Sequence, residues 1–337
     1  MGIDRTGPEN GHREDSVTEL NELNAQLISI CIPTCNRPGL LEEAIRSCEA
    51  QTYADFEIVI GDDSSDDRTE QAVKRCRLHA KHLIRYERNV PRLGQASNVN
   101  RLFARARGAR LVLLHDDDLL EPHALTTLDA CWQAHPDLSA AFGKQRVIAD
   151  DGTPRPDATA RLNRDYGRVP ERAGRLAVPA LAGIDQMFPN NGYLVDTLVA
   201  RRIGYRLAAQ VGEACDFDFG LRLCVEAAGV YFADEFVSVS RETALSISTH
   251  ALPAMHAFAQ LCESDVPAAA RAARDAALRR VAPRAASAYA RAGEAGAAWR
   301  VLLSKHYALR DRLRARFLYH VLLATRSTLS PRTPPGG

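Results

Sequence analysis

Short apolar runs alternate with stretches of helical spacing through the first 135 residues of the chain. The runs at residues 27–32, 56–60 and 110–114 are almost wholly apolar, which is typical of parallel strands buried on both faces. A weaker strand is expected at residues 82–86. The stretches between these strands carry apolar residues at helical spacing and predict helices that begin at Pro38, after residue 66, at Ala96 and at Pro122.

The pattern is less regular from residue 138 onward. Asp151-Gly152 indicates a tight turn after an apolar run. Residues 153–192 are rich in Pro, Gly and Arg and predict a long irregular segment. The regular elements expected here are strands at residues 138–149, 193–200 and 230–240 and a helix at residues 216–228.

From residue 252 the chain is rich in Ala and Arg and predicts helices, with breaks at Pro267, Pro283 and residues 293–296. The alternation of strands and helices before this region predicts an α/β fold. We expect a mainly parallel central sheet flanked by helices, followed by an α-helical C-terminal extension.

Charge is divided unevenly along the chain. The 337 residues carry 43 Lys or Arg and 42 Asp or Glu, which argues against an evenly basic nucleic-acid-binding protein. Residues 266–337 alone carry 14 basic and three acidic side chains, so the C-terminal helices are strongly basic. Three interpretations of these helices stay open: a lid on the catalytic domain with a solvated basic face, peripheral contact with a membrane, and self-association.

Composition favours a cytoplasmic protein. No apolar run approaches the roughly 18–20 residues that span a bilayer, and the first residues carry no signal-sequence pattern. The eight cysteines include no CxxC pair, so we expect reduced and mostly buried thiols. Peripheral contact at the inner face of the membrane is compatible with the basic helices.

Two acidic clusters follow expected strands, Asp62-Asp63 after one and Asp116 to Asp118 after another. Ligands of open α/β sheets bind at such strand ends. Adjacent carboxylates repel each other unless a cation is present, and Mg²⁺ or Mn²⁺ binds carboxylates together with phosphate oxygens. The cluster of three therefore predicts a metal site for a phosphorylated ligand. The alternative is a solvated acidic turn before the next helix.

Four ordered motifs resemble those of family 2 glycosyltransferases. They are ISICIPTCN at residues 28–36, QTY at 51–53, EIVIGDDSS at 57–65 and LLHDDDLL at 113–120, and the resemblance spans residues 27–245. It implies a GT-A type fold and an inverting, nucleotide-sugar-dependent enzyme that uses Mg²⁺ or Mn²⁺. It also implies a UDP- or dTDP-type donor, a glycan or lipid-linked acceptor, and a role in polysaccharide or glycoconjugate biosynthesis.

The same resemblance assigns a donor site and a metal site to residues at the strand ends. It implies that Asp63 accepts a hydrogen bond from the nucleotide base. It places the metal on Asp116 and Asp118, with Asp118 as the direct ligand. The donor-binding residues implied in this way are Pro33, Thr34, Asn36, Asp63, Asn89, Gly94, Asn98, Asp116 and Asp117.

A catalytic base is expected near the start of the helix at residues 216–228, because glycosyl transfer must remove a proton from the acceptor hydroxyl. The resemblance places this base at Asp216. Asp218 lies about 200° further round the helix and cannot share its face. The alternative for Asp216 is that it caps the N-terminus of the helix.

Several positions depart from the family pattern. Ser97-Asn98 replaces the usual Arg-Asn pair, which leaves open that Asn98 is an ordinary exposed helix residue. His115 stands where many relatives have Asp, and Cys215 replaces an acid before the base. A looser match, to residues that close over the diphosphate in relatives, consists of Arg241, Ser246, Ser248 and His250.

Other classes of function fit less well. A sugar-phosphate nucleotidyltransferase needs a Gly-rich basic loop after the first strand, and a haloacid-type phosphatase needs Asp-x-Asp-x-Thr there, whereas this chain has PTCNRP. A catalytically degenerate relative that binds nucleotide-sugar or a partner stays open. The expected organisation is a flexible segment at residues 1–26, a nucleotide-sugar-binding half of the GT-A domain at 27–150, an acceptor-binding half at 151–251, a basic helical extension at 252–330 and a disordered tail at 331–337.

Overall fold

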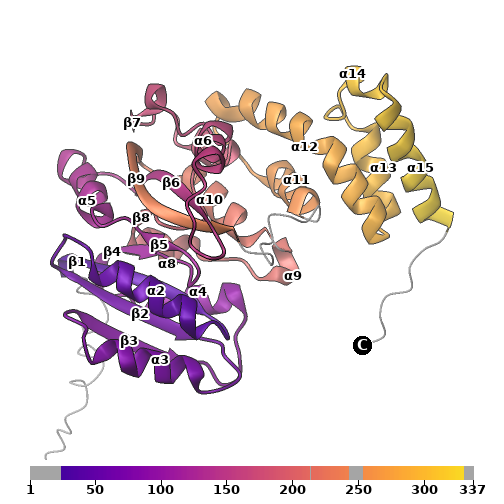
Figure 1. Cartoon of the computed structure of the whole chain (residues 1–337). Coiled ribbons are helices and arrows are strands. Elements are labelled where there is room, and N and C mark those ends of the chain that lie inside the picture. The colour runs from indigo at the N-terminus through magenta and orange to yellow at the C-terminus, as the bar shows by residue number, and fades with distance from the viewer. Residues whose placement is uncertain (1–23, 213, 243–252, 330–337) are drawn as a thin grey trace, which may run out of the picture.

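A nine-stranded mixed sheet forms the centre of the molecule in a computed structural model that describes residues 24–212, 214–242 and 253–329 (Figure 1). The expected flexible N-terminal segment (apart from its last residues), Ser246, Ser248, His250 and the expected tail lie outside the described residues. In order across the sheet, the strands are β3 (Leu83–Arg88), β2 (Phe56–Asp62), β1 (Asn24–Thr34), β4 (Gly108–Leu113), β8 (Leu194–Asp196), β6 (Ala140–Ala149), β9 (Val230–Glu242) and β5 (Leu119–Leu120), with β7 (Gly174–Arg175) paired to β9.

The first four strands of this order are parallel, as expected. The sheet becomes mixed at β8, which runs antiparallel to both β4 and β6, while β6 and β9 are parallel. The register pairs Thr34 with Asp62 and Cys31 with Leu113. The carboxyl ends of β1, β2 and β4 therefore lie side by side, and the loops that follow them share one edge of the sheet.

Helices cover both faces of the sheet because the strand side chains are apolar on both sides. Ile30 and Ile32 of β1 are buried in one core, whereas Cys31 is buried in the other. Along the chain, the helices of this part are α2 (Pro38–Glu49), α3 (Arg68–Arg77), α4 (Gln95–Arg105), α5 (Ala124–Ala134), α6 (Pro156–Asp165), α7 (Ala180–Ile184), α8 (Thr197–Ile203), α9 (Ala208–Val211) and α10 (Cys215–Glu226).

Two expectations for the second half are wrong. Residues 153–192 are not irregular throughout, because they contain α6 and α7. The only buried side chain of α6 is that of Asn163, so the helix has no apolar stripe to reveal it. The strand expected at residues 193–200 ends at Asp196, whose carboxylate accepts a hydrogen bond from the Val199 backbone at 2.9 Å and caps α8.

The C-terminal region is helical, as expected. It comprises α11 (Pro253–Glu263), α12 (Arg271–Ala292), α13 (Ala295–Leu303), α14 (Leu309–Arg312) and α15 (Ala315–Leu329), and Figure 1 shows α13–α15 at the opposite end of the molecule from β1–β3.

A third core of small and aliphatic side chains joins these helices to α7 and α10. The break expected at Pro283 is wrong, because α12 continues through it. Its neighbours Ala282, Ala285 and Ala286 are strong helix formers and are buried in the third core. Gly293, with φ at 88°, ends α12 where a break was expected.

Two further sequence expectations can be compared with the structure. All eight cysteines lie in the described residues and are free thiols, five of them buried. Among the described helices, none combines the length and apolar character that crossing a bilayer requires.

Candidate active site

The loop between β4 and β5 carries the three adjacent carboxylates. Thr34, at the end of β1, donates a hydrogen bond of 2.7 Å to Asp116 Oδ2. The guanidinium of Arg37 contacts both Asp116, at 3.3 Å, and Asp117, at 2.9 Å. Burial raises the pKa of Asp116. The end of β1 and the start of α2 therefore hold Asp116 through its two oxygens and leave Asp117 with one contact to a partly exposed cation.

Asp118 is buried, and among the described residues only the imidazole of His115, 4.0 Å away, can give it a cationic partner. Its Oδ2 accepts a hydrogen bond of 2.6 Å from the side-chain amide of Asn191, and its Oδ1 accepts one of 2.8 Å from the backbone N–H of Arg241. The residue is 3% exposed. Burial raises the pKa of this carboxyl from 3.8 to about 7. Asp118 is thus a buried carboxylate that no arginine or lysine neutralises among the described residues.

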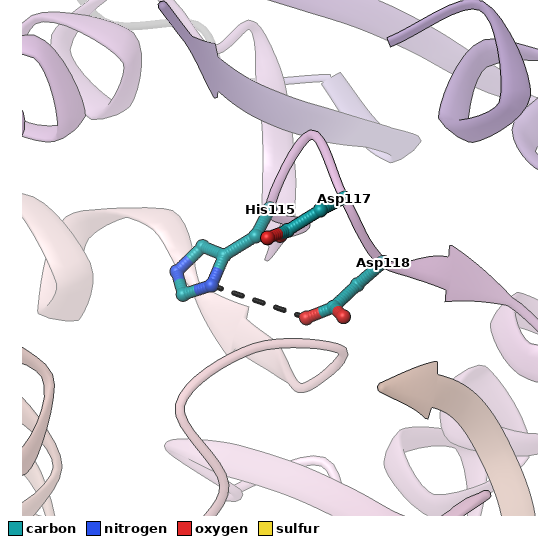
Figure 2. A group of neighbouring side chains, drawn as sticks. All are labelled: His115, Asp117 and Asp118. Atoms are coloured by element: carbon teal, nitrogen blue, oxygen red, sulfur yellow. Dashed lines mark ion pairs between the residues drawn. The ribbon is translucent and has the colours of Figure 1, made fainter. Parts of the chain in front are cut away.

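His115, drawn beside Asp118 in Figure 2, contacts both Asp118 and the expected base. Its Nδ1 is 4.0 Å from Asp118 Oδ2, and its Nε2 is 3.8 Å from Asp216 Oδ1. Burial by itself lowers the pKa of the imidazole, but Asp216, Asp118 and the neighbouring carboxylates raise it above its ordinary value. The negative charge on both sides of the ring therefore stabilises its protonated form.

One set of donor atoms in this loop fits a divalent cation. One atom each of His115, Asp117 and Asp118 lie within 4.8 Å of one another, and Figure 2 shows the three side chains around a shared space. Carboxylate oxygens with an imidazole nitrogen suit Mn²⁺ and, less closely, Mg²⁺. Asp116, expected from the sequence as a metal-binding residue, is not in this set and faces Thr34 and Arg37 instead.

Asp216 projects from the first turn of α10 toward this loop. The N-cap of α10 is Ala214, so Asp216 does not cap the helix, and that alternative is wrong. Its Oδ1 accepts a hydrogen bond of 3.0 Å from the Tyr205 hydroxyl. Its side chain is 25% exposed, so this carboxylate is accessible from outside while it faces His115.

Asp218, two residues further along α10, has a different environment. It is fully buried and forms ion pairs with the guanidinium groups of Arg206 and Arg222. The expected separation of Asp216 and Asp218 onto different faces is seen directly in these partners. Asp218 therefore holds α10 in place and lies apart from the acidic loop.

Asp63 organises the second part of the candidate site. Its Oδ1 accepts hydrogen bonds from the Asn89 side-chain amide at 2.9 Å and from the Leu93 backbone at 3.1 Å. Its Oδ2 accepts one of 2.8 Å from the backbone N–H of Gly94, which has φ at 79° and precedes α4. That conformation strongly favours glycine. Asp63 thus folds the loop at residues 89–94 against the end of β2.

Asn98 is buried at 2% exposure, so the alternative of an ordinary exposed helix residue is wrong. Its amide donates a hydrogen bond of 2.8 Å to the Gly61 carbonyl, and its Oδ1 accepts one of 3.1 Å from Asn89. A Cβ at Gly61 would collide with the Asn98 side chain. Asn98 therefore packs against the end of β2 and orients Asn89.

The end of β1 connects the two parts. The Asp63 backbone donates a hydrogen bond of 2.9 Å to the Thr34 carbonyl. Pro33 is half-buried and pairs in register with Gly61. Asn36 is exposed, and its Oδ1 accepts a hydrogen bond of 2.9 Å from the Ser65 backbone. The expected donor-site residues thus form one continuous edge, from the loop at residues 89–94 to the acidic loop.

Arg241 links the acidic loop to neighbouring parts of the chain. Its guanidinium donates to the Asp117 carbonyl at 3.0 Å, to the Asp150 carbonyl at 2.8 Å and to Glu43 at 2.6 Å. The side chain is 3% exposed. Because all three of its nitrogens have protein partners, Arg241 holds the loop in its conformation.

Sequence reasoning missed the contribution of four residues. In the sequence Arg37 marks only a helix start, because it lies 79 residues before Asp116 and no spacing relates the two. Asn191 and Tyr205 lie in the less regular second half, where no spacing relates them to the acidic loop. His115 was noted only as a departure from a family pattern, whereas the structure places it in contact with both Asp118 and Asp216.

Comparisons with known proteins agree with this geometry. Residues 29–189 match the family model "Glycosyl transferase family 2". An uncharacterized protein of Mycobacterium tuberculosis is 33% identical over 238 residues, which cover 67% of this chain and 70% of that protein. A GalNAc(5)-diNAcBac-PP-undecaprenol beta-1,3-glucosyltransferase of Campylobacter jejuni is 35% identical over 101 residues, 30% of this chain and 33% of that enzyme.

Solved structures show the same fold at low sequence identity. Residues 1–349 of Staphylococcus aureus TarS in complex with UDP-GlcNAc superpose with a TM-score of 0.64 at 15% identity, over 89% of this chain and 88% of that one. The mannosyltransferase PcManGT of Pyrobaculum calidifontis, in complex with GDP-Man and Mn²⁺, gives a TM-score of 0.55 at 18% identity, over 88% and 86%.

The motifs at the strand ends, the sheet with its flanking helices and these matches lead to one assignment. The chain is a glycosyltransferase with a GT-A fold and belongs to glycosyl transferase family 2.

Proposed function

We propose that this glycosyltransferase moves a sugar from a nucleoside diphosphate to an acceptor hydroxyl, with inversion at the anomeric carbon and dependence on a divalent cation. The observation that carries the proposal is the position of Asp216. Its carboxylate, partly exposed, faces the acidic loop across His115 at 3.8 Å. This geometry supports the proposal, because a proton acceptor would face a cation-binding loop across one space, as group transfer from a diphosphate requires.

The donor would lie along the edge that joins the two parts of the site. Asp63 would accept a hydrogen bond from the ring N–H of the base, with Pro33, Thr34 and Asn36 beside it. Asn89, Gly94 and Asn98 would shape the ribose and diphosphate region. Asn98 would act indirectly, because it is buried and contacts Asn89. Asp116 and Asp117 would border the diphosphate.

The cation would be held by His115, Asp117 and Asp118. We prefer Asp117 to Asp116 because both oxygens of Asp116 already contact Thr34 and Arg37. Asn191 and the Arg241 backbone would orient Asp118. When bound, Mg²⁺ or Mn²⁺ would supply positive charge that stabilises the departing diphosphate.

Asp216 would accept the proton of the acceptor hydroxyl. The acceptor oxygen forms its bond to the anomeric carbon while the bond from that carbon to the diphosphate oxygen breaks. The products are the glycoside, a nucleoside diphosphate and protonated Asp216. Tyr205 would hold the carboxylate through its 3.0 Å hydrogen bond. The TarS fragment binds UDP-GlcNAc and the Campylobacter enzyme is named for an undecaprenol-linked acceptor, which favours a UDP-type donor and a lipid-linked glycan acceptor.

Release of nucleoside diphosphate tests the proposal. The intact chain is incubated with a panel of nucleotide-sugars, Mn²⁺ and lipid-linked or free glycan acceptors. Asp216→Asn should lower turnover about 10²–10⁴-fold, the range for losing a general base, with donor affinity unchanged. Asp137→Asn, which removes an exposed carboxylate paired only with Arg175 among the described residues, is the matched control. A wild-type chain that binds donor and releases no diphosphate with any acceptor would instead support the degenerate relative.

A further inference from the structure

Large apolar side chains are exposed mainly at one end of the molecule. Twelve such side chains are strongly exposed in the part of the chain that the structure describes, and seven of them fall within residues 303–329. The seven, between 47% and 84% exposed, are Leu303, Leu309, Leu313, Leu318, Tyr319, Leu322 and Leu329. Single exposed leucines are ordinary, but such a concentration marks an interaction surface.

The helix α15 has two apolar faces. At 100° per residue, Leu318, Leu322 and Leu329 lie within about 40° of one another, and all three are exposed. His320 and Ala324 lie on the other side, where they are buried. Only one face of α15 is therefore needed to pack against α12 and α13. The outer face, together with Leu309 and Leu313 of the adjoining α14 region, is called the leucine face below.

Basic side chains are frequent on the helices that carry the leucine face. Residues 303–329 contain six Lys or Arg and one Asp. Asp311 pairs with Arg314 at 3.2 Å. Arg310, Arg316 and Arg326 are exposed, and none of them has a carboxylate partner within the described ranges. The surface thus combines exposed leucines with unneutralised positive charge.

We propose that the leucine face docks the enzyme on a bilayer that contains anionic lipid. Leucine side chains would enter the acyl boundary and bury apolar area there. The arginines would meet lipid phosphates, which attract basic residues near a charged membrane surface. Because no described helix is suited to span a bilayer, the contact is peripheral and in the plane of the interface.

Charge distinguishes this occupant from a second copy of the chain. In a two-fold symmetric contact, the same surface patch lies on both sides of the interface. Two leucine faces in contact would bring the exposed arginines of both copies, such as Arg310 and Arg326, toward one interface, and neither has a carboxylate partner among the described residues. An anionic bilayer buries the same leucines and neutralises the same arginines, so the observed chemistry favours lipid. The proposal does not depend on the identity of the donor or of the base.

Vesicle co-sedimentation of the full chain tests the proposal. Vesicles of phosphatidylcholine with about 30% phosphatidylglycerol are compared with phosphatidylcholine alone. The wild type should bind the anionic vesicles at least about tenfold more strongly, and salt should weaken binding. Leu318→Glu with Leu322→Glu should reduce binding at least about tenfold, since two leucines are lost and two like charges approach the lipid. Arg310→Gln with Arg326→Gln should lower binding to anionic vesicles alone.

A matched control pair carries the same substitutions at exposed leucines elsewhere. Leu78→Glu with Leu198→Glu alters side chains that are 79% and 54% exposed, and this variant should bind like the wild type. Thermal melting and diphosphate release with a water-soluble acceptor show that each variant is folded. Equal binding of the wild type and the Leu318/Leu322 variant would overturn the proposal. So would self-association in sedimentation velocity that this variant abolishes, with no vesicle binding. Failure of the proposed reaction would leave the vesicle result intact.

Discussion

Two buried carboxylates, Asp118 and Asp218, show how differently one chain treats the same group. Asp218 pairs with the guanidinium groups of Arg206, which precedes α9, and of Arg222, which lies one turn further along α10. Asp118 accepts hydrogen bonds from a side-chain amide and a backbone N–H, and an imidazole nitrogen lies 4.0 Å away. The two residues are almost equally buried, at 0% and 3% exposure.

The difference distinguishes a carboxylate that supports the fold, Asp218, from one that is suited to chemistry, Asp118. A buried carboxylate is expected to be paired, because its charge is costly to remove from water. Asp218 follows this rule. Asp118 departs from it in part, since its one cationic neighbour among the described residues is an imidazole at 4.0 Å, and burial raises the pKa of its carboxyl. Unpaired buried charge of this kind gathers at functional sites, where a ligand supplies the missing counter-charge. The following predictions test this division.

The largest expected effect is on catalysis. Asp118→Asn should lower turnover about a thousandfold, because the loop loses the carboxylate proposed to hold the cation, a contribution of several kcal/mol to the transition state. The metal-free melting temperature should stay the same or rise, since the variant removes a buried carboxylate that no arginine or lysine neutralises among the described residues. Diphosphate release measures the loss of turnover, and thermal melting measures the change in stability. A marked loss of metal-free stability would show that Asp118 supports the fold as Asp218 does.

Asp218→Asn should have the reverse effect. Removing the shared partner leaves two guanidinium groups without a counter-charge, and breaking a buried pair costs about 3–5 kcal/mol. We expect about 3 kcal/mol in the free energy of unfolding, since the arginine side chains are 34% and 23% exposed. Denaturant unfolding measures the loss. Well below the melting temperature, the folded fraction should keep its turnover within a few fold.

The sequence predicts the positions of the acidic side chains better than it predicts the groups that surround them. The acidic clusters could be located because each follows an apolar strand, and the carboxyl ends of parallel strands meet at one edge. The register of Thr34 with Asp62 confirms that reasoning. Asp216 was found by resemblance, and its separation from Asp218 by helix geometry.

The environment of Asp118 could not be predicted in the same way. Asn191 lies 73 residues after Asp118 in the sequence. Their contact in space depends on the neighbouring antiparallel strand β8, which breaks the parallel order of the sheet. Asp196 was read as part of a strand, although an Asp before Thr-Leu-Val also fits a helix N-cap. Neutral partners such as Asn191 and Tyr205 carry no charge pattern that sequence spacing reveals.

Stability of the metal-free chain should depend on pH through the acidic loop. The pKa of Asp118 is raised from 3.8 to about 7 on folding, so between these values the folded chain holds a proton that the unfolded chain has released. Stability from this group is therefore present near pH 4 and lost as the pH rises toward 7. The raised pKa of His115 adds a loss of the same sign as the pH rises further. Melting temperatures between about pH 5 and 8 measure the slope.

Two comparisons identify the source of that slope. Asp118→Asn should flatten it, because the variant side chain does not titrate, whereas Asp137→Asn at the exposed pair with Arg175 should leave it unchanged. Added Mn²⁺ should raise the melting temperature more at high pH than at low pH, because a cation binds the ionised carboxylate. An unchanged slope in the Asp118 variant would place the titration elsewhere in the chain.

The smallest expected effect concerns Asp216, whose hydrogen-bond partner among the described residues is the Tyr205 hydroxyl at 3.0 Å. Asp216 resembles Asp118 in being held by a neutral donor, so its support should affect turnover more than stability. Tyr205→Phe should lower kcat about tenfold, the equivalent of one hydrogen bond to a charged group, with the KM for the donor unchanged. Tyr53→Phe removes an exposed hydroxyl that contacts the Gln26 carbonyl at 2.7 Å and should leave kcat unchanged. If Tyr205→Phe instead lowered stability by several kcal/mol and left kcat intact, the Tyr205–Asp216 contact would belong with the arginine-bound Asp218 as support of the fold.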